Sequence, residues 1–232
     1  MITVWRIALD PRRAPPPDAV AELSDGERAR AARFVSDEFR NRWLHGHVAM
    51  RRILAQALGA APRSLEFDAN AAGKPGLASH RTSQGGPAID FNFSDSGDLA
   101  LLAVSTVGAV GVDVEQVRPQ PALERITRRF FADEEREALF ALPAEHQLEA
   151  FFRIWARKEA YIKAVGTGLA AGLQLFAVTI DADEARFVRL DAAPGEVEQW
   201  SLRSVRVPAG YHAAVATRRV PVDVEERDYR GT

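Results

Sequence analysis

Apolar positions along this chain follow two spacings, which divide it into short strand-like runs and longer helical stretches. Alternating or continuous runs of Val, Ile, Leu, Phe and Ala predict strands, whereas spacings of three and four predict helices. The predicted strands are residues 2–9, 64–68 (weakly), 88–93, 99–104, 110–114, 176–180, 187–190, 200–207 and 212–217. The predicted helices are residues 24–34, 37–58, 123–131, 133–141 and 148–165. The charged tail after residue 222 is expected to be loose.

Short local signals mark where several of these helices begin and end. Ser24 followed three residues later by Glu27 resembles a capping box, in which each side chain satisfies a backbone amide at the start of a helix. Gly59 follows the second predicted helix, and Gly166 follows the last one before the strand-like remainder. These signals support the helical stretches independently of the apolar spacing.

Parts of the first half of the chain recur in the second half. Residues 33–38 (Arg-Phe-Val-Ser-Asp-Glu) resemble residues 129–134 (Arg-Phe-Phe-Ala-Asp-Glu), and residues 97–103 resemble residues 210–216. Chance similarity of short strings is the alternative to duplication. With duplication, the pattern predicts an α+β fold of two similar halves in a pseudo-twofold arrangement, residues 1–115 and 116–232. The halves would form one compact unit with a cleft between them, a common place for a ligand.

Composition narrows the class of protein. Of the 232 residues, 47% are hydrophobic and 27% charged, as in ordinary globular domains. The net charge of −2 does not call for a nucleic acid or an anionic membrane as partner. The sequence has no cysteine, which excludes disulfides, thiolate metal sites and a cysteine nucleophile, and fits a reducing cytoplasm. Neither a signal peptide nor an apolar run of membrane-spanning length is apparent, since a span needs roughly 20 apolar residues.

Residues 111–115 (Gly-Val-Asp-Val-Glu) carry two carboxylates in a predicted strand. Because side chains alternate along a strand, Asp113 and Glu115 point to one face while the two valines point to the other. Two carboxylates on one face form half of a site for a hard cation such as magnesium. The alternative is a solvated strand face.

Residues 155–163 (Trp-Ala-Arg-Lys-Glu-Ala-Tyr-Ile-Lys) place Trp155, Glu159 and Lys163 along one side of a predicted helix. A surface ion pair between Glu159 and Lys163 is the simpler interpretation. The neighbouring tryptophan indicates instead that this side is buried or lines a cleft, where an unpaired carboxylate is costly. A metal ion shared with Asp113 and Glu115 would provide its partner.

Two basic features of the first half are candidates for anion binding. Lys74 lies between Gly73 and Pro75 on a stiff loop and could reach a phosphate as a point charge. Several arginines, including Arg30 and Arg51, give the first helices a basic side. Most of these arginines are expected to be solvated, but one or two could bind phosphate oxygens.

Taken together, these segments resemble the Sfp-type 4′-phosphopantetheinyl transferases. The family pattern is G-hydrophobic-D-hydrophobic-E, then W-x-x-K-E-(A/S)-x-x-K, then G-x-G-L, which here are residues 111–115, 155–163 and 166–169. The upstream G-K-P and F-N-x-S-H-S segments match residues 73–75 and 91–96, with Asp95 in place of the family histidine. The resemblance extends from about residue 23 to residue 178.

The resemblance implies the 4′-phosphopantetheinyl transferase fold, a monomer of two similar halves with coenzyme A in the cleft. It implies transfer of the 4′-phosphopantetheine arm of coenzyme A to a serine of an apo acyl or peptidyl carrier protein. The products would be holo-carrier and 3′,5′-ADP, and Mg²⁺ would be required, as in a holo-[acyl-carrier-protein] synthase. The length of the chain and its two halves favour, by analogy, the broad type that serves secondary metabolism.

The resemblance also assigns roles to single residues. It makes Asp113, Glu115 and Glu159 the magnesium ligands, with Glu159 also the general base and Lys163 the stabiliser of the leaving group. The implied coenzyme A contacts are Gly73, Lys74, Pro75, Ser94, Asp95 and Lys158. Because an aspartate beside a phosphate repels it, we expect arginines, foremost Arg30 and Arg51, to hold the 3′-phosphate, with Asp95 orienting one of them.

Two other classes of function fit parts of the pattern. One is a non-catalytic module that binds coenzyme A or a nucleotide, although binding alone does not need a general base. The other is a magnesium-dependent phosphodiester hydrolase that uses the same carboxylates without a protein co-substrate. Incubation with an apo carrier protein distinguishes these classes, because only the transferase adds a phosphopantetheine arm to the carrier.

Overall fold

The computed structural model describes residues 1–69, 73–78, 89–166, 172–191 and 194–231. Its α-helices are α1 (Pro17–Val20), α2 (Asp25–Ala31), α3 (Asp37–Leu58), α4 (Leu123–Phe130), α5 (Asp133–Ala141) and α6 (Ala144–Val165). Its strands are β1 (Ile2–Ala8), β2 (Phe67–Ala69), β3 (Pro75–Leu77), β4 (Asp90–Ser96), β5 (Leu99–Ser105), β6 (Val110–Gln116), β7 (Phe176–Val178), β8 (Phe187–Leu190), β9 (Ser201–Ser204), β10 (Tyr211–Thr217) and β11 (Val224–Asp228). Short 3-10 turns lie at Pro62–Ser64, Leu173–Leu175 and Pro194–Gln199.

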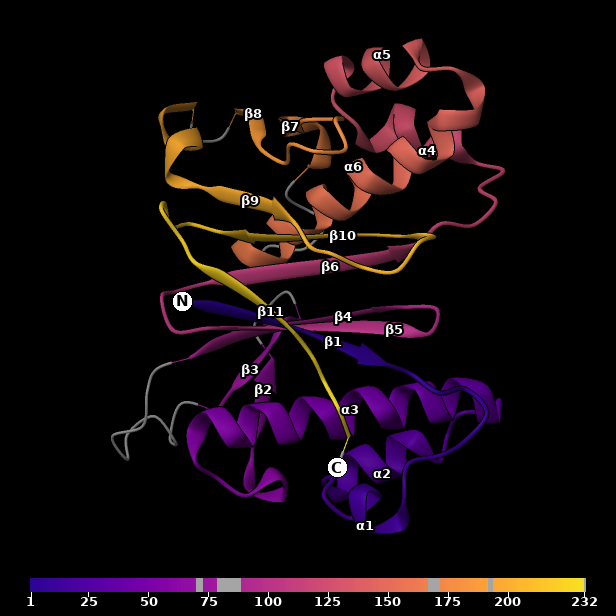
Figure 1. Cartoon of the computed structure of the whole chain (residues 1–232), viewed down its shortest axis with the longest axis vertical. Helices are drawn as coiled ribbons and strands as arrows, with labels where there is room; N and C mark the ends of the chain where they lie inside the picture. The colour runs from indigo at the N-terminus through magenta and orange to yellow at the C-terminus, as the bar shows by residue number, and fades with distance from the viewer. Residues whose placement is uncertain (70–72, 79–88, 167–171, 192–193, 232) are drawn as a thin grey trace.

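Two sheets stacked face to face form the centre of the molecule (Figure 1). The first sheet has the strand order β11-β1-β5-β4 and the second the order β6-β10-β9. Helix α3 covers the outer face of the first sheet, and α6 covers the outer face of the second (Figure 1). The observed architecture is therefore α+β, as predicted.

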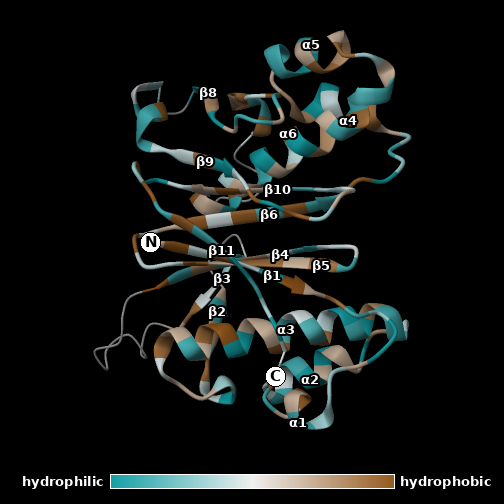
Figure 2. Cartoon of the chain, in the orientation of Figure 1, coloured by the Kyte–Doolittle hydropathy of each residue, from teal (hydrophilic) through white to brown (hydrophobic). Residues whose placement is uncertain are grey.

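Apolar side chains fill the three spaces between these four layers. Val4 and Leu101 of the first sheet meet Val112 and Val215 of the second, and all four are at most 2% exposed. Further buried clusters join α3 to the first sheet and α6 to the second. Hydrophobic residues accordingly lie along the inner strands such as β1 and β6, whereas the edge strands β9 and β11 are largely hydrophilic (Figure 2). This packing holds any group on a strand edge in a fixed place.

The two halves resemble each other, because each has a helix of 22 residues lying on a sheet with three consecutive antiparallel strands. The expected division after Glu115 falls within β6, and β6 forms hydrogen-bonded pairs with β10 along its whole length. β6 thus belongs to the second sheet. We therefore propose that the halves divide in the connection between Ser105 and Val110.

The local helix signals are confirmed. The Ser24 hydroxyl accepts from the Glu27 amide at 3.2 Å, and the Glu27 carboxylate accepts from the Ser24 amide at 2.8 Å. Gly59 and Gly166 end α3 and α6 with φ of 63° and 74°, a left-handed conformation that favours glycine. Helix α6 begins at Ala144, one turn earlier than its apolar spacing predicts.

The prediction of a loose tail after residue 222 is wrong. These residues form β11, which pairs in parallel with β1 at the edge of the first sheet. The guanidinium of Arg6 holds Glu226 and Asp228, each at 2.7 Å. Charged residues thus form an edge strand here because their partners lie on the neighbouring strand, more than 200 residues away in sequence.

Two segments fall outside the described residues. One is the G-x-G-L segment beyond Gly166, and the other is the polar, glycine-rich run of residues 81–87, whose composition predicts an exposed turn. In the described part of the chain, none of the helices combines the length and the apolar character that crossing a bilayer requires.

Candidate functional site

Helix α6 lies unusually close to β6, and Gly111 makes this approach possible. A Cβ atom at Gly111 would be 2.1 Å from the carbonyl oxygen of Ala160 and 2.3 Å from the amide nitrogen of Ala164. Real side chains do not tolerate such distances to backbone atoms. The glycine therefore lets the last turns of α6 rest on the strand that carries the two predicted carboxylates.

This close packing brings Lys163 to Asp113. The Lys163 ammonium contacts Asp113 Oδ1 at 2.6 Å and Ser94 Oγ at 2.8 Å, and Ser94 also donates to Asp113 Oδ1 at 2.8 Å. Lys163 thus forms its ion pair with a residue of β6, and not with Glu159 on the surface of its own helix. Asp113 is only 3% exposed, and within the described structure its second oxygen, Oδ2, is buried without a hydrogen-bond partner.

The charges of Asp113 and Lys163 influence the pKa values of the other two predicted carboxylates, Glu115 and Glu159. Burial, followed by the charge of Asp113, raises the pKa of Glu115 to about 7, while a hydrogen bond from Ser96 at 3.1 Å opposes the rise. Burial and the charge of Asp113 also raise the pKa of Glu159, and Lys163 opposes this. Three carboxylates around one lysine leave the cluster short of positive charge.

The chemistry of this cluster fits a hard divalent cation. The buried, unpartnered Oδ2 of Asp113 is an oxygen donor of the type such a cation prefers. However, within the described ranges no group of three or more acidic, histidine or cysteine side chains lies close enough together to hold a metal ion. Magnesium usually takes one or two carboxylates and completes its shell with substrate phosphates and water. The donor set therefore fits, while the ligand set Asp113, Glu115 and Glu159 stays a proposal.

A pocket of about 730 Å³ lies between the Gly-Lys-Pro loop and the end of α6, where its lining begins at Ala164, the residue after Lys163. Lys74, Pro75 and Gly76 line one side of it, and Ala164, Val165 and Gly166 line the other. The Lys74 ammonium donates to Asp90 and to the carbonyl of Val110, both at 3.0 Å. Gly73 precedes this lysine with a φ of 84°. The structure thus brings the loop together with the helix of Lys163.

Lys158 does not face this pocket, contrary to the coenzyme A contact expected for it. Its side chain is fully buried and bonds both carboxylate oxygens of Glu135, at 2.9 and 2.7 Å, and the carbonyl of Phe176 at 2.7 Å. Burial lowers the pKa of Lys158 and raises that of Glu135, and their mutual ion pair opposes both shifts. Lys158 therefore joins α6 to α5 and β7, a structural role.

The guanidinium of Arg51 is likewise occupied by partners within the protein. Its side chain is 2% exposed and donates to Glu27 at 2.7 Å and to the carbonyls of Pro62 and Leu65 at 2.6 and 3.2 Å. A guanidinium held on these partners cannot also hold a phosphate, so the expected role is corrected. Arg30 is exposed and lies over the ring of Trp43, with its Cζ atom 5.7 Å from the ring centroid.

Asp95 lies near the end of β4, beside the cluster. Burial raises the pKa of its carboxyl, and the charge of Lys163 opposes the rise. Lys163 is thus the cation that acts on Asp95, in place of the arginine that we expected it to orient.

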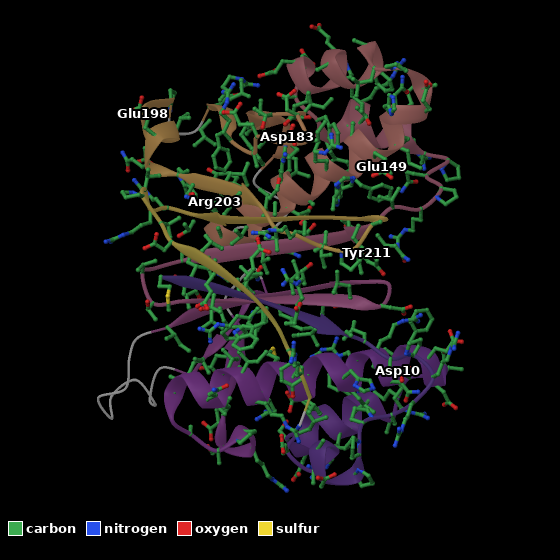
Figure 3. The ribbon with its side chains drawn as sticks, viewed as in Figure 1. Asp10, Glu149, Asp183, Glu198, Arg203 and Tyr211 are labelled. Atoms are coloured by element: carbon green, nitrogen blue, oxygen red, sulfur yellow. The ribbon has the colours of Figure 1, made fainter. Side chains whose placement is uncertain are left out.

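Sequence reasoning missed several residues that shape the site. Ser96 bonds Glu115, and its only sequence signal is its position at the end of the F-N-x-S-x-S segment. His212 of β10 lies directly opposite Glu115 and forms a 2.6 Å contact with Glu149 of α6. Tyr211, which precedes His212, lies at this end of β10, and Glu149 lies above it on α6 (Figure 3). Nothing in the local sequence links these residues, because they meet only when the two sheets and α6 pack together.

Comparison with known families covers nearly the whole chain. The 4′-phosphopantetheinyl transferase superfamily matches residues 109–216. A second family, described as 4′-phosphopantetheinyl transferase, N-terminal, matches residues 10–107. The boundary between the two matches lies in the connection between β5 and β6.

Individual proteins are similar over most of their length. The 4′-phosphopantetheinyl transferase HetI of Nostoc sp. is 38% identical, over 93% of this chain and 86% of the relative. The 4′-phosphopantetheinyl transferase psf-1 of Bacillus pumilus is 34% identical, over 85% of this chain and 79% of the relative. Among solved structures, the holo-[acyl-carrier-protein] synthase of Thermotoga maritima matches with a TM-score of 0.36 and 22% identity, over 47% of this chain and 61% of that one.

Proposed function

This chain belongs to the 4′-phosphopantetheinyl transferases, and we propose that the cluster of Lys163, Asp113 and Ser94 is its reaction centre. The enzyme transfers the 4′-phosphopantetheine arm of coenzyme A to a carrier protein. The single observation that carries the proposed centre is the contact of Lys163 with Asp113 and Ser94.

The reaction breaks the phosphoanhydride bond within the diphosphate of coenzyme A and forms a phosphoester bond to the carrier serine. The hydroxyl oxygen of a carrier serine attacks the phosphorus that bears the pantetheine arm. The bond from this phosphorus to the oxygen of 3′,5′-ADP breaks, and the serine loses its proton. A poor nucleophile thus meets an anionic phosphate, so the site has to accept a proton and stabilise negative charge.

Glu159 and Lys163 are suited to these two tasks. The raised pKa of Glu159 makes this carboxylate a better proton acceptor than an ordinary surface glutamate, so we assign it as general base. In the described part of the chain, Ser94 and Asp113 account for two of the three hydrogens of the Lys163 ammonium. The third can donate to a phosphate oxygen and stabilise the charge that develops on the leaving group.

Asp113, Glu115 and Glu159 would hold Mg²⁺ together with the diphosphate of coenzyme A. A bound Mg²⁺ would neutralise phosphate charge and align the diphosphate for in-line displacement. Asp113 contributes the buried oxygen that has no other partner in the described structure. Ser94 keeps the opposite oxygen of the same carboxylate in place.

The pocket between the Gly-Lys-Pro loop and the end of α6 would receive the nucleotide end of coenzyme A. Its loop side carries Lys74, which is 14% exposed and tied to Asp90. Pro75, which follows Lys74 in the loop, lines the same side, and Ala164 and Gly166 line the opposite side at the end of α6. Of the two arginines expected to bind the 3′-phosphate, only Arg30 is exposed, so Arg30 remains the proposed contact.

We further propose that the enzyme acts as a monomer in the cytoplasm on acyl or peptidyl carriers of secondary metabolism. The absence of cysteine from the whole sequence supports the compartment. The two similar halves support the oligomeric state, because one chain already supplies both sides of the site.

Glu159→Gln tests the general base. We expect kcat/KM for the carrier to fall about 100-fold or more, because the amide cannot accept the serine proton. Binding of coenzyme A, measured by calorimetry, should largely persist. The assay incubates the enzyme with coenzyme A, Mg²⁺ and a panel of apo carrier proteins, and mass spectrometry detects the added arm.

Glu145→Gln is the matched control, since Glu145 is exposed in the first turn of the same helix. This variant should match the wild type. Turnover retained in Glu159→Gln would remove the general-base assignment. Release of 3′,5′-ADP by the wild type without a carrier, and no mass gain on any carrier, would instead favour the hydrolase. Coenzyme A binding with neither activity would favour the binding module.

Asp95→Asn tests whether the phosphates of coenzyme A approach this side of Lys163. Removal of one negative charge near a phosphate is worth about 1 kcal/mol in a solvated site, so KM for coenzyme A should fall about 5-fold. Asp183→Asn, at an exposed position on the far side of the second sheet, should leave KM unchanged (Figure 3). An equal or higher KM in Asp95→Asn would place the phosphates away from this residue.

A further inference from the structure

The two central sheets are joined by a row of side-chain hydrogen bonds. β6 is an edge strand of the second sheet, so every other amide along its free edge lacks a neighbouring strand. Side chains from alternate positions of β4 accept from these amides. The pairs are Asp90 with Val110 (2.8 Å), Asn92 with Val112 (2.8 Å), Ser94 with Val114 (3.4 Å) and Ser96 with Gln116 (3.0 Å).

The last two members of this row also contact the two acidic side chains of β6. Ser94 donates to Asp113 Oδ1 at 2.8 Å, and Ser96 donates to Glu115 Oε2 at 3.1 Å. The same arrangement thus occurs twice, two residues apart. Each hydroxyl accepts from the amide of one residue and donates to the carboxylate of the residue before it.

The chemistry of the partners fixes the direction of these hydrogen bonds. A backbone amide can only donate, and so can the Lys163 ammonium that contacts Ser94. The single proton of each serine hydroxyl is therefore directed to the carboxylate. Such a donor favours the ionised, acceptor form of the acid and restrains its rotation.

Burial makes this orientation persistent. Ser94 and Ser96 are 6% and 8% exposed, and Asp113 is 3% exposed. A buried hydroxyl or amide that loses its partner has no water to replace it, so rotating one carboxylate away would leave unpaired groups. The first two members of the row, Asp90 and Asn92, bond the same strand, but no bond from either to an acidic side chain is among those described.

We infer that Ser96, together with Ser94, is a positioning residue that holds the two acidic side chains of β6 ready for a divalent cation. The inference rests on the proposed cation site. In this inference, side chains of the first sheet orient the carboxylates of Asp113 and Glu115, which belong to the second sheet. Ser96 itself touches neither substrate nor reacting atoms in this assignment.

Ser96→Ala tests the inference through metal binding itself. Mn²⁺ replaces Mg²⁺ as a probe, and its affinity is measured by electron paramagnetic resonance on the full chain, with and without coenzyme A. We expect the Kd for Mn²⁺ to rise about 10-fold, as found for partners that orient metal ligands. The Mg²⁺ concentration for half-maximal activity should rise by a similar factor, while kcat at saturating Mg²⁺ is largely kept. Ser96→Thr, which retains the hydroxyl, should restore the wild-type Kd.

Asn92→Ala is the matched control for stability, because it removes one bond of the same row without touching a carboxylate. Its urea midpoint should fall at least as far as that of Ser96→Ala, while its Kd for Mn²⁺ stays at the wild-type value. An unchanged Kd in Ser96→Ala would overturn the inference, and so would an equal weakening in Asn92→Ala. A wild type that binds no Mn²⁺, even with coenzyme A, would contradict the proposed cation site and the inference with it.

Discussion

Gly111→Ala should lower the free energy of unfolding by at least ~3 kcal/mol, because overpacking against backbone is among the costlier core changes. The added methyl carbon would lie 2.1, 2.3 and 2.8 Å from backbone atoms of Ala160, Ala164 and Lys163. None of these atoms belongs to a flexible side chain that could turn aside. The strain is relieved only if α6 moves away from β6, and this displacement also carries Lys163 away from Asp113.

Urea unfolding measures the stability, and the carrier assay measures the activity of whatever protein remains folded. Transfer should be lost even where the fold survives. Gly195→Ala is the matched control, since its added carbon would meet nothing within 4 Å, and it should change stability by no more than about 0.5 kcal/mol. Near-normal stability and activity in Gly111→Ala would mean that α6 does not depend on this close contact.

Lys158→Ala should cost about 3–5 kcal/mol of stability, since it leaves the Glu135 carboxylate buried without its cation. Glu135 also accepts from the amides of Ala132 and Val178, at 2.9 and 2.8 Å, so it cannot turn to solvent without breaking these bonds. The double variant Lys158→Met with Glu135→Gln should lose less than Lys158→Ala alone. It removes both charges and keeps an oxygen acceptor at residue 135.

Thermal and urea unfolding measure both variants. Arg128→Ala provides the comparison, because its ion pair with Glu124 is exposed on α4 and should contribute under about 1 kcal/mol. A stable Lys158→Ala whose KM for coenzyme A is raised would contradict the structural role and restore a contact with the substrate.

The fold could be predicted from the sequence where local chemistry determines it. The bounds of α3 agree with the prediction because Ser36 caps its first turn and Gly59 ends it in a left-handed conformation. The alternation in β6 correctly placed Asp113 and Glu115 on one face. Both results follow from backbone periodicity and need no knowledge of distant parts of the chain.

The roles of the basic residues could not be predicted in the same way. Lys158 and Lys163 are five residues apart, which places them about 140° apart around a helix, so they cannot serve the same cleft. Arg51 was predicted to hold a phosphate because its actual partners, Glu27 and two carbonyls, come from other elements and leave no local signal. A charge on a buried side of a helix is recognised only when its tertiary partner is known.

The row of bonds between β4 and β6 was beyond prediction for a related reason. Alternating Asp90, Asn92, Ser94 and Ser96 read as the polar side of a half-exposed strand. In the structure they replace the backbone of a missing neighbouring strand. No local pattern distinguishes these two uses of polar residues.

The pairing of β11 with β1 bears on how the polypeptide is made. Ile2 is synthesised more than 200 residues before Asp223, yet its amide donates to the carbonyl of Asp223 at 2.9 Å. While the intervening residues are synthesised, the outer edge of β1 has no partner strand, because β11 does not yet exist. The first sheet is thus completed after the second. A chain truncated before Val224 would keep an open edge on β1, and such an edge is prone to aggregation.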